Sequence, residues 1–433
     1  MNNETVIGKA GKFNIGFRDI TLASHAGIVL IKEMVDRLGI AELIDQELKV
    51  KARERGYRES ESILALCWNL ILGGGHLSDL DVLRGDPGTQ QLLGLESVIA
   101  PTTAGEFLRK FGMGDICDLR RLLRLISERV RPSQTSDTCT IDLDASVYEQ
   151  CTKGKEGSCT AYNGQVGYHP LFCFWAEEGE LLLTHLLAGK RHPAGKVLWF
   201  LQQVWKVVPA GKRLQLRADS AFYSWDVIDE LERRQIIYAI TADSSESLRL
   251  EIEALPAKSW KGYNHDPAIS IAELWYAPHG HKEHRYLIKR VLLKDKGGKT
   301  SYKYYAVITN DLRHTPRQLM KWALKRCAME NQIKEHKSQS GFSLEKLPTK
   351  MFFANWAWLL IGQLAFNLVA WFKRLVLPEQ YHTSTIKTIR YHVLNLAGRI
   401  VESGRQFFLL LSDHYRFKDV WQFALKKLAK LVT

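Results

Sequence analysis

The sequence predicts an α/β protein in which a mixed sheet is flanked by helices, and the spacing of its apolar residues supports this in three ways. Over residues 20–131 the apolar residues recur with the period of an amphipathic helix. From residue 138 the period changes to two, and further strand-like runs follow with a helical stretch among them. Beyond residue 313 the helical period returns. Strands and helices mixed in this order are typical of a layered α/β architecture.

Residues 1–134 are predicted to form an N-terminal helical region. Turn sequences such as LGGGHLSD and RGDPG separate its helical runs. The glycines at 73–75 follow one such run, where glycine more often ends a helix than holds a phosphate. Thr102 and Thr103 are predicted to cap the helix that follows them, which is consistent with a short helical module that reads DNA.

Acidic side chains end two of the predicted strands. In TCTIDLDASVY, which begins at residue 138, alternation places Asp142 and Asp144 on one face and the apolar side chains on the other. Asp144 ends this strand, and Asp219 ends a later strand within LQLRADS. Acidic residues at strand ends, where the chain leaves the sheet, are well placed to converge on one ligand.

Converging carboxylates imply a particular chemistry. They repel one another unless a cation is supplied, and their hard oxygen atoms select Mg²⁺ or Mn²⁺. Two such ions about 3.5 to 4 Å apart can activate a nucleophilic oxygen and stabilise the leaving oxygen of a phosphodiester. The strand-end acids therefore indicate a site for metal-assisted chemistry on a phosphodiester.

A third acid lies on a predicted helix, KRCAMENQIKEHK, at residues 325–337. Glu330 shares a helix face with Arg326, Lys334 and Lys337, at offsets of four, four and seven residues. If Glu330 joins the two strand acids, the three cations flank the same site and can hold DNA phosphates. The alternative is a surface helix whose i,i+4 ion pairs contribute a few tenths of a kcal/mol each.

The net charge of +13 arises from one region. Residues 1–312 contain 40 Lys and Arg and 40 Asp and Glu, whereas residues 313–433 contain 20 and 7. A surface of one sign attracts a polyanion, and nucleic acid is the commonest partner of a soluble basic region. A solubilising face is the alternative.

The sequence also predicts a cytoplasmic location without a membrane partner. Its first residues lack the basic start and apolar stretch of a secretory signal. The seven cysteines form no CxxC pair, which favours reduced thiols. The longest apolar run, residues 356–372, is at the lower limit for spanning a bilayer and is interrupted by Gln363 and Asn367, so a buried helix is expected.

Four segments in order resemble the catalytic core of bacterial insertion-sequence DDE transposases: DLDAS, LRADSAFYS, RCAMENQIKEHK and MFFANWAWLLIGQLAFNL. The resemblance spans roughly residues 60–375. It implies an RNase H-like mixed sheet flanked by helices, with a β-rich subdomain inserted before the last acid and a helical domain at the N-terminus. The corresponding boundaries are a catalytic domain at 135–245 and 302–375, an insertion at 246–301, and a basic C-terminal helical region at 376–433.

The resemblance implies cut-and-paste transposition by a homodimer that bridges two DNA ends in the nucleoid. Asp144, Asp219 and Glu330 would coordinate two Mg²⁺ or Mn²⁺ ions. Water would cleave double-stranded DNA at the terminal inverted repeats, and the freed 3′-hydroxyl would attack target DNA. Two alternatives are a metal-dependent RNase H-like nuclease that cleaves without joining, and an inactive relative that only binds DNA.

Such transposases often carry Tyr, Arg, Glu and Lys around the last acid, separated by two, three and six residues. Arg326, Glu330 and Lys337 fit this spacing, but Ala323 stands at the tyrosine position, so the phosphate contact expected of the tyrosine has no assigned residue. The family places small or hydroxyl residues directly after the first acid. This favours Asp144 over Asp142.

The resemblance adds accessory candidates. Gln165, Tyr168 and His169 lie in a segment, GQVGYHPLFCF, that resembles the strand after the first acid, and they could approach the site. In relatives that form hairpin ends, the insertion supplies an aromatic residue that stacks on a flipped base. Trp260 and Trp275 are the candidates here, because base stacking contributes roughly 1 to 3 kcal/mol. An ordinary structural role is the alternative for all five residues.

Overall fold

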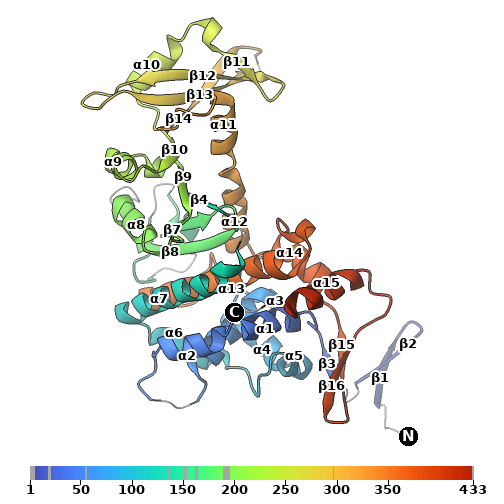
Figure 1. Cartoon of the computed structure of the whole chain (residues 1–433). Coiled ribbons are helices and arrows are strands. Elements are labelled where there is room, and N and C mark those ends of the chain that lie inside the picture. The colour runs from blue at the N-terminus through green and yellow to red at the C-terminus, as the bar shows by residue number, and fades with distance from the viewer. Residues whose placement is uncertain are drawn as a thin grey trace.

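The computed structural model describes the chain in eight stretches: residues 5–17, 21–53, 56–134, 136–150, 154–160, 164–188, 196–295 and 297–431. A body of helices lies at one end, a mixed sheet leads away from it, and a set of long strands lies at the far end (Figure 1). The prediction of a mixed α/β fold is confirmed.

The helical body is built around one buried helix, α13 (Phe352–Trp371). Seven helices from the first third of the chain form the rest: α1 (Ile28–Arg37), α2 (Ile40–Glu47), α3 (Glu59–Leu72), α4 (Leu80–Arg84), α5 (Pro87–Leu92), α6 (Pro101–Arg109) and α7 (Met113–Val130). Helices α3, α6 and α7 contact α13 directly. The predicted helical periodicity of residues 20–131 is confirmed.

Helix α13 is apolar and long enough to cross a membrane, but most of its surface is buried within the protein. The two polar residues that interrupt it have partners. Asn367 accepts a hydrogen bond from the backbone N–H of Leu181 at 2.8 Å, and both Asn367 and Gln363 donate to the Leu181 carbonyl at 2.9 Å. The predicted buried helix is confirmed, and its amides join it to the neighbouring strand.

Two predictions about helix ends had different outcomes. Gly73 ends α3 with a φ of 111°, a conformation that favours glycine, as predicted. The predicted caps Thr102 and Thr103 are wrong, because α6 begins one residue earlier. Pro101 takes the first helical position, which lacks an intrahelical N–H bond in any case, and Ala100 precedes it.

The central sheet has a mixed strand order. Strand β7 (Val166–Trp175) runs antiparallel to both β8 (Glu180–Ala188) and β4 (Thr138–Ala145). Strand β9 (Arg213–Ala218) is parallel to β4, and β10 (Ile237–Thr241) is parallel to β9. The short strands β5 (Tyr148–Glu149) and β6 (Cys159–Thr160) also pair with β7. The alternation predicted for β4 is confirmed, since its apolar side chains all enter one core.

That core lies between the sheet and two helices, α8 (Val197–Val204) and α9 (Trp225–Arg233). It contains Cys139, Ile141 and Leu143 from β4. The opposite face of β4 carries the polar side chains and looks toward the helices that follow residue 313.

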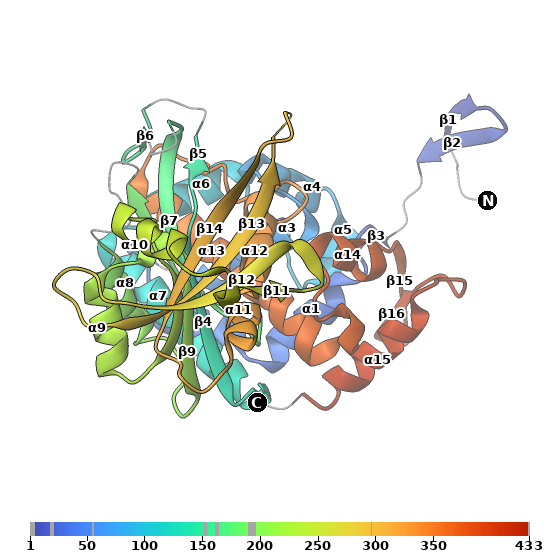
Figure 2. The ribbon, with the colours of Figure 1, turned by 90° about the horizontal axis from the view of Figure 1, so that it is seen from above.

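The insertion continues the central sheet. Its strands are β11 (Lys261–Tyr263), β12 (Asp266–Tyr276), β13 (His284–Lys294) and β14 (Thr300–Thr309), preceded by helix α10 (Glu246–Glu253). Strand β14 pairs with β10, so the order β11-β12-β13-β14-β10 joins the insertion to the strands that carry the acids. The predicted boundary after residue 301 therefore falls inside β14. Figure 1 shows these strands at the end farthest from the helical body, and in the view from above they lie in front of it (Figure 2).

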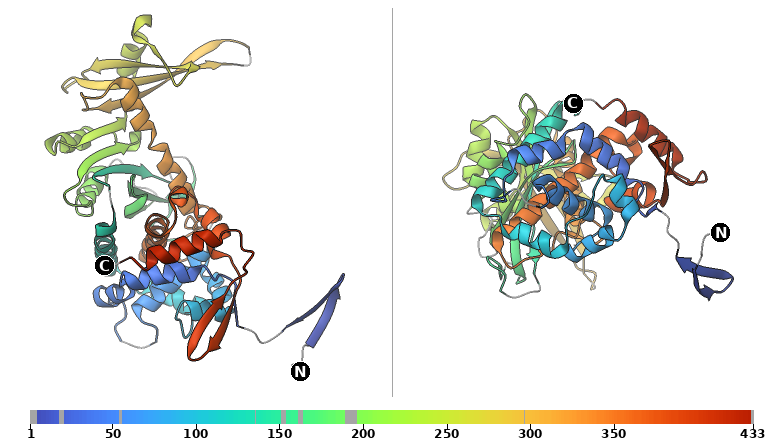
Figure 3. Two further views of the ribbon diagram at one scale, coloured as in Figure 1. Left: turned by 45° about the vertical axis from the view of Figure 1, so that its right-hand side comes forward. Right: turned by 90° about the horizontal axis from the view of Figure 1, so that it is seen from below.

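Two successive helices, α11 (Pro316–Leu324) and α12 (Cys327–Lys337), run from the insertion toward the centre of the molecule (Figure 3). The turn between them keeps right-handed helical geometry. It is tightened by i to i−3 hydrogen bonds, such as that from the Met329 N–H to the Arg326 carbonyl at 2.9 Å. The helix predicted for residues 325–337 is confirmed from Cys327 onward.

Strands from both ends of the chain pair beside the helical body. Strand β15 (Gly398–Ser403) pairs with β16 (Gln406–Leu410) and with β3 (Leu22–Ala23), and helices α14 (Ile386–Ile389) and α15 (Lys418–Leu428) lie beside it. The hairpin of β1 (Thr5–Ala10) and β2 (Phe13–Phe17) precedes them. On α15, Trp421 and Leu428 are buried. Leu425 is 54% exposed because Ala424 takes the inward position.

Candidate active site

The carboxyl ends of β4 and β9 bring two acids together. The strands are adjacent and parallel, with Leu143 opposite Ala218, so Asp144 and Asp219 follow at neighbouring positions. Asp144 accepts a hydrogen bond from the backbone N–H of Ala145 at 2.7 Å. Asp219 accepts one from Ala221 at 3.1 Å and thereby caps a short 3₁₀ helix, Ser220–Phe222. Both side chains are fixed by the backbone where the strands end.

The turn before α12 adds an arginine and the third acid. Arg326 donates from Nη1 to Oδ2 of Asp144 and from Nη2 to Oε1 of Glu330, each at 3.0 Å. One guanidinium therefore joins two carboxylates from distant segments. The side chains of Asp144 and Arg326 are 11% and 17% exposed, whereas that of Glu330 is 47% exposed. The predicted helical pair Arg326–Glu330 is present, but it also reaches into the sheet.

The two strand acids are electrostatically unfavourable neighbours. Burial and the negative charge of Asp219 raise the pKa of Asp144 to about 7, even though the positive charge of Arg326 acts in the opposite direction. Burial also raises the pKa of Asp219, again against the effect of Arg326. A single guanidinium thus compensates the acids only in part, and further positive charge would favour their ionised forms.

Asp142, two residues before Asp144, has a different environment. Its carboxylate is buried and accepts two hydrogen bonds from Arg217, at 2.6 and 2.7 Å. Arg217 also donates to the carbonyl of Trp322 at 2.9 Å, which ties the end of α11 to the sheet. Asp142 is committed to this pair, so of the two acids Asp144 is the one left for chemistry. The role of Arg217 could not be predicted from the sequence, because only the register between β4 and β9 places it opposite Asp142.

The sequence profile of the family described as transposase DDE domain group 1 matches residues 7–433, nearly the whole chain. The chain belongs to this family of transposases. It is also similar to two solved structures. A cryo-EM structure of the piggyBac transposase synaptic complex with hairpin DNA shares 12% identity, covers 93% of this chain and 81% of that chain, and has a TM-score of 0.45. A crystal structure of the Mos1 strand transfer complex shares 13% identity, covers 47% and 64% of the two chains, and has a TM-score of 0.18. No curated protein matches the sequence.

DDE transposases generally use divalent metal ions. In the described part of this transposase, no three Asp, Glu, His or Cys side chains lie close enough together to hold a metal ion. Arg326 lies between Asp144 and Glu330 and supplies positive charge there. The donor set still fits a hard divalent cation, because it consists of carboxylate oxygens and two of the acids have raised pKa values. Glu330 would have to leave Arg326 to join them.

The two predicted lysines of α12 differ. Lys334 is exposed. Lys337 donates to the carbonyl of Val147 at 2.7 Å and to Ser146 at 3.3 Å, and it pairs with Glu345 at 3.0 Å. In this arrangement the ammonium group of Lys337 holds the loop that follows Asp144.

The accessory candidates on β7 do not reach the acids. Tyr168 is buried in the core of the helical body and donates to the carbonyl of Glu156 at 2.7 Å. His169 is buried, and alternation along β7 places it on the face opposite Phe172, the residue that pairs with Asp144. Gln165 is exposed and donates to Glu149 at 3.1 Å. In this structure the three candidates lie past the end of β4, because β7 and the residue before it extend beyond Ala145. Their part in the site stays a prediction.

The two candidate tryptophans differ in accessibility. Trp260 is half-buried, and the guanidinium of Arg290 lies 3.9 Å from its ring centroid. Trp275, on β12, is 48% exposed. An aromatic face that already holds a guanidinium is less available to a base, so Trp275 is the more accessible of the two.

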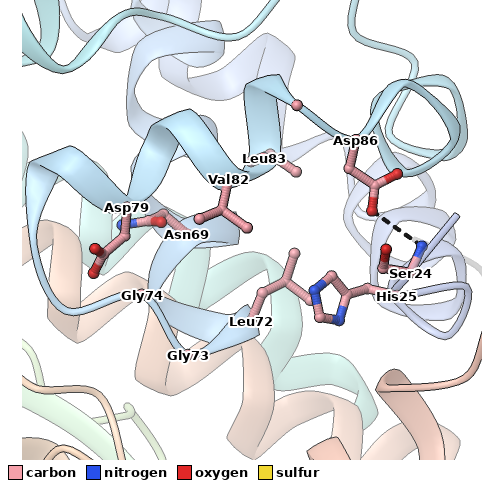
Figure 4. A pocket seen from close by; sticks show the side chains of 11 residues that line it. Ser24, His25, Asn69, Leu72, Gly73, Gly74, Asp79, Val82, Leu83 and Asp86 are labelled. Atoms are coloured by element: carbon pink, nitrogen blue, oxygen red, sulfur yellow. Dashed lines mark hydrogen bonds between the residues drawn. The ribbon is translucent and has the colours of Figure 1, made fainter. Parts of the chain in front are cut away.

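A separate cavity of about 450 Å³ lies in the helical body, beside the end of α3 (Figure 4). Its acids hold the backbone in place. Asp86 accepts a hydrogen bond from the N–H of Ser24 at 3.0 Å, and Asp79 accepts from Gly75 and His76 at 2.8 and 2.9 Å. None of the candidate catalytic residues lines this cavity.

Proposed function

We propose that this transposase cuts double-stranded DNA at the ends of its element and joins the freed 3′-hydroxyls to target DNA. The observation that carries the proposal is the gathering of Asp144, Asp219 and Glu330, from two strand ends and one helix, around Arg326. The proposed catalytic domain is RNase H-like. Its support is the order β8-β7-β4-β9-β10, in which β7 is antiparallel to its neighbours and β4, β9 and β10 are parallel.

Asp144, Asp219 and Glu330 are the proposed ligands of two Mg²⁺ or Mn²⁺ ions. When bound, the ions would activate the attacking oxygen and stabilise the leaving oxygen of the phosphodiester. The protein's own contribution is to hold the two strand acids at fixed backbone positions and to exclude water from Asp144, which is buried.

The cations have distinct proposed roles. Arg326 lies next to the acids, and its planar guanidinium suits bidentate contact with a phosphate once the carboxylates bind metal. Lys334, on the exposed side of α12, is proposed to contact the DNA backbone. Lys337 positions the loop after Asp144 through Ser146 and Val147, so its proposed effect on DNA is indirect.

DNA is the proposed partner because the excess positive charge lies in residues 313–433, which include α12. A homodimer on the DNA is proposed as well. Exposed apolar side chains lie near the end of the chain, at Phe407, Phe408 and Leu410 on β16, and a second subunit could cover them. Trp275 is the proposed residue for stacking on a displaced base.

The test is incubation with the DNA that flanks its own gene, once with Mg²⁺ and once with EDTA. Strand cleavage should occur only with Mg²⁺, and the 3′ ends should then join a target plasmid. Asp144→Asn, Asp219→Asn and Glu330→Gln should each reduce cleavage at least ~1000-fold, since metal-supplied charge stabilisation amounts to several kcal/mol, with DNA binding retained.

Asp226→Asn is the matched control, because Asp226 is an exposed acid on α9, which covers the opposite face of the sheet. Cleavage without joining would identify a nuclease. If Asp219→Asn left every activity unchanged, the chain would be a DNA-binding relative without catalysis.

A further inference from the structure

A basic site separate from the candidate active site lies at the outer edge of the insertion. It is a cavity of about 690 Å³ between β11, β12 and the start of α11. Lys258, Lys261 and Arg317 bring positive charge to its lining, and Glu273 brings the one carboxylate. The sequence alone did not predict that these residues lie together, because they are separated by up to 59 positions.

The charges in this cavity do not cancel. Lys258 and Lys261 are exposed and form no ion pair within the described ranges. Arg317 donates to the carbonyl of Gly262 at 2.8 Å, a bond that leaves its charge uncompensated. Glu273 pairs with Arg285 at 2.8 Å, so its negative charge is already balanced. The cavity is therefore a site for an anion.

The wider insertion is basic as well. Residues 258–305 contain ten Lys and Arg but four Asp and Glu. Acids elsewhere in the first 312 residues offset this excess in the regional count, which is why the count placed all the basicity in the C-terminal part. The positive charge of the insertion becomes apparent only when its residues are considered as one part of the three-dimensional structure.

The cavity and the candidate active site lie on the same face of the extended sheet. Ile271 and Leu287, on this face of the insertion, pack with Leu319 and Met320 of α11. The other end of α11 is tied to Arg217, on the face that carries the acids. Helices α11 and α12 follow one another from the insertion toward the helical body (Figures 1 and 3). Pro316 and Arg317, at the start of α11, line the cavity, and Glu330 lies on α12.

Two independent lengths give the separation. Glu330 lies fourteen residue steps after Pro316, or about 21 Å of helix at 1.5 Å per step. Four strand spacings separate β9 from β12, or about 19 Å. Both lengths correspond to about six nucleotides of B-form DNA at 3.4 Å each.

We infer that this cavity binds a backbone phosphate of the same DNA duplex that is cut at Asp144, Asp219 and Glu330, about six base pairs from the scissile phosphate. Lys258 and Lys261 supply the charge, and Arg317 fixes β11 to α11 so that the site stays at a constant distance from the acids. This inference rests on the proposed function, because it takes the scissile phosphate to lie at those acids.

The first experiment measures binding of the full-length protein to the flanking duplex by fluorescence anisotropy, in EDTA so that no cleavage occurs. Wild type is compared with Lys258→Ala/Lys261→Ala at 50 and 200 mM salt. Loss of two phosphate contacts should make the fall in affinity between these salt concentrations about tenfold smaller than in wild type. Lys258→Arg/Lys261→Arg, which keeps both charges, should behave as wild type.

Lys206→Ala/Lys212→Ala is the matched control, because these lysines precede the amino end of β9, opposite the end that carries Asp219. Its salt dependence should equal that of wild type. A salt dependence of the Lys258→Ala/Lys261→Ala variant that also equals wild type would overturn the inference. So would a salt dependence of Lys258→Arg/Lys261→Arg that is as weak as that of the double alanine variant.

The second experiment locates the contact. Single neutral methylphosphonates are placed along the duplex, and the position that weakens wild-type binding should lie about six nucleotides from the scissile phosphate. The Lys258→Ala/Lys261→Ala variant should be insensitive at that position. If it is as sensitive as wild type, the phosphate is not in this cavity.

Cleavage of the same duplex by wild type in Mg²⁺ separates the two proposals. Cleavage together with an unchanged salt dependence would reject the cavity and retain the proposed function. A changed salt dependence without cleavage would retain the cavity as a site for DNA phosphate and reject the proposed chemistry.

Discussion

Asp142 and Asp144 lie on one face of β4, two residues apart, and each contacts an arginine, but the two contacts differ in their charge balance. Asp142 and Arg217 form a buried, bidentate pair with no other charge between them. Asp144 shares Arg326 with Glu330 and also lies beside Asp219. The first arrangement balances one charge with one charge, whereas the second places three acids around one cation. The difference separates a one-to-one buried pair from a group of acids whose negative charge one arginine balances only in part.

The largest effect is expected where the balanced pair is broken. Asp142→Ala leaves Arg217 buried without a counter-charge, so the free energy of unfolding should fall by about 3 to 5 kcal/mol, measured by urea denaturation. The double variant Asp142→Leu/Arg217→Met should recover most of this loss, since it leaves no buried charge. A single variant as stable as wild type would show that the pair does not stabilise the fold.

Replacing Asp144 by asparagine should instead stabilise the protein at high pH. The raised pKa of Asp144 means that the folded state holds a proton that the unfolded state has lost between pH 3.8 and about 7, so wild type loses stability as the pH rises through this range. Asp144→Asn removes that loss. At pH 8 in EDTA it should be more stable than wild type by up to about 4 kcal/mol.

At pH 4 the difference between Asp144→Asn and wild type should vanish, because the wild-type carboxyl is then protonated in the folded state. Thermal unfolding at both pH values measures this. A destabilised Asp144→Asn at pH 8 would show that the pair with Arg326 outweighs burial and the charge of Asp219.

Divalent metal should stabilise the protein by binding at Asp144, Asp219 and Glu330, and not at the pair of Asp142 and Arg217. At 100 times its Kd, Mg²⁺ or Mn²⁺ should raise the free energy of unfolding of wild type by about 2.7 kcal/mol, seen as a higher Tm. Asp219→Asn should lose most of this response, whereas the control Asp226→Asn should keep it. An equal response in all three proteins would place the ion elsewhere.

The smallest effect concerns the arginine that joins the acids. Arg326→Met removes a cation that competes for Asp144 and Glu330, so Mn²⁺ should bind about three- to tenfold more tightly in the absence of DNA, measured by electron paramagnetic resonance. Lys334→Met, at an exposed position of the same helix, should leave Mn²⁺ affinity unchanged. Weaker binding in Arg326→Met would mean that Arg326 organises the acids.

Much of this comparison was predictable. Alternation along β4 placed Asp142 and Asp144 on one face, and helical spacing placed Arg326 beside Glu330, because both patterns depend on residues a few positions apart. The pairing of Asp142 with Arg217 was not predictable, since it depends on how two strands 75 residues apart are aligned. The burial of Tyr168 was not predictable either, because it depends on the packing of α13 against β7.

The sequence by itself determined the order of helical and strand regions and the places of the three candidate acids within that order, because local periodicity and short motifs encode them. Only the tertiary structure decided which acid is neutralised, where Lys337 is held, and that the insertion extends the central sheet. These outcomes depend on strand register and on packing between distant segments. A carboxylate's charge state is set by the groups that the fold brings within a few ångströms of it.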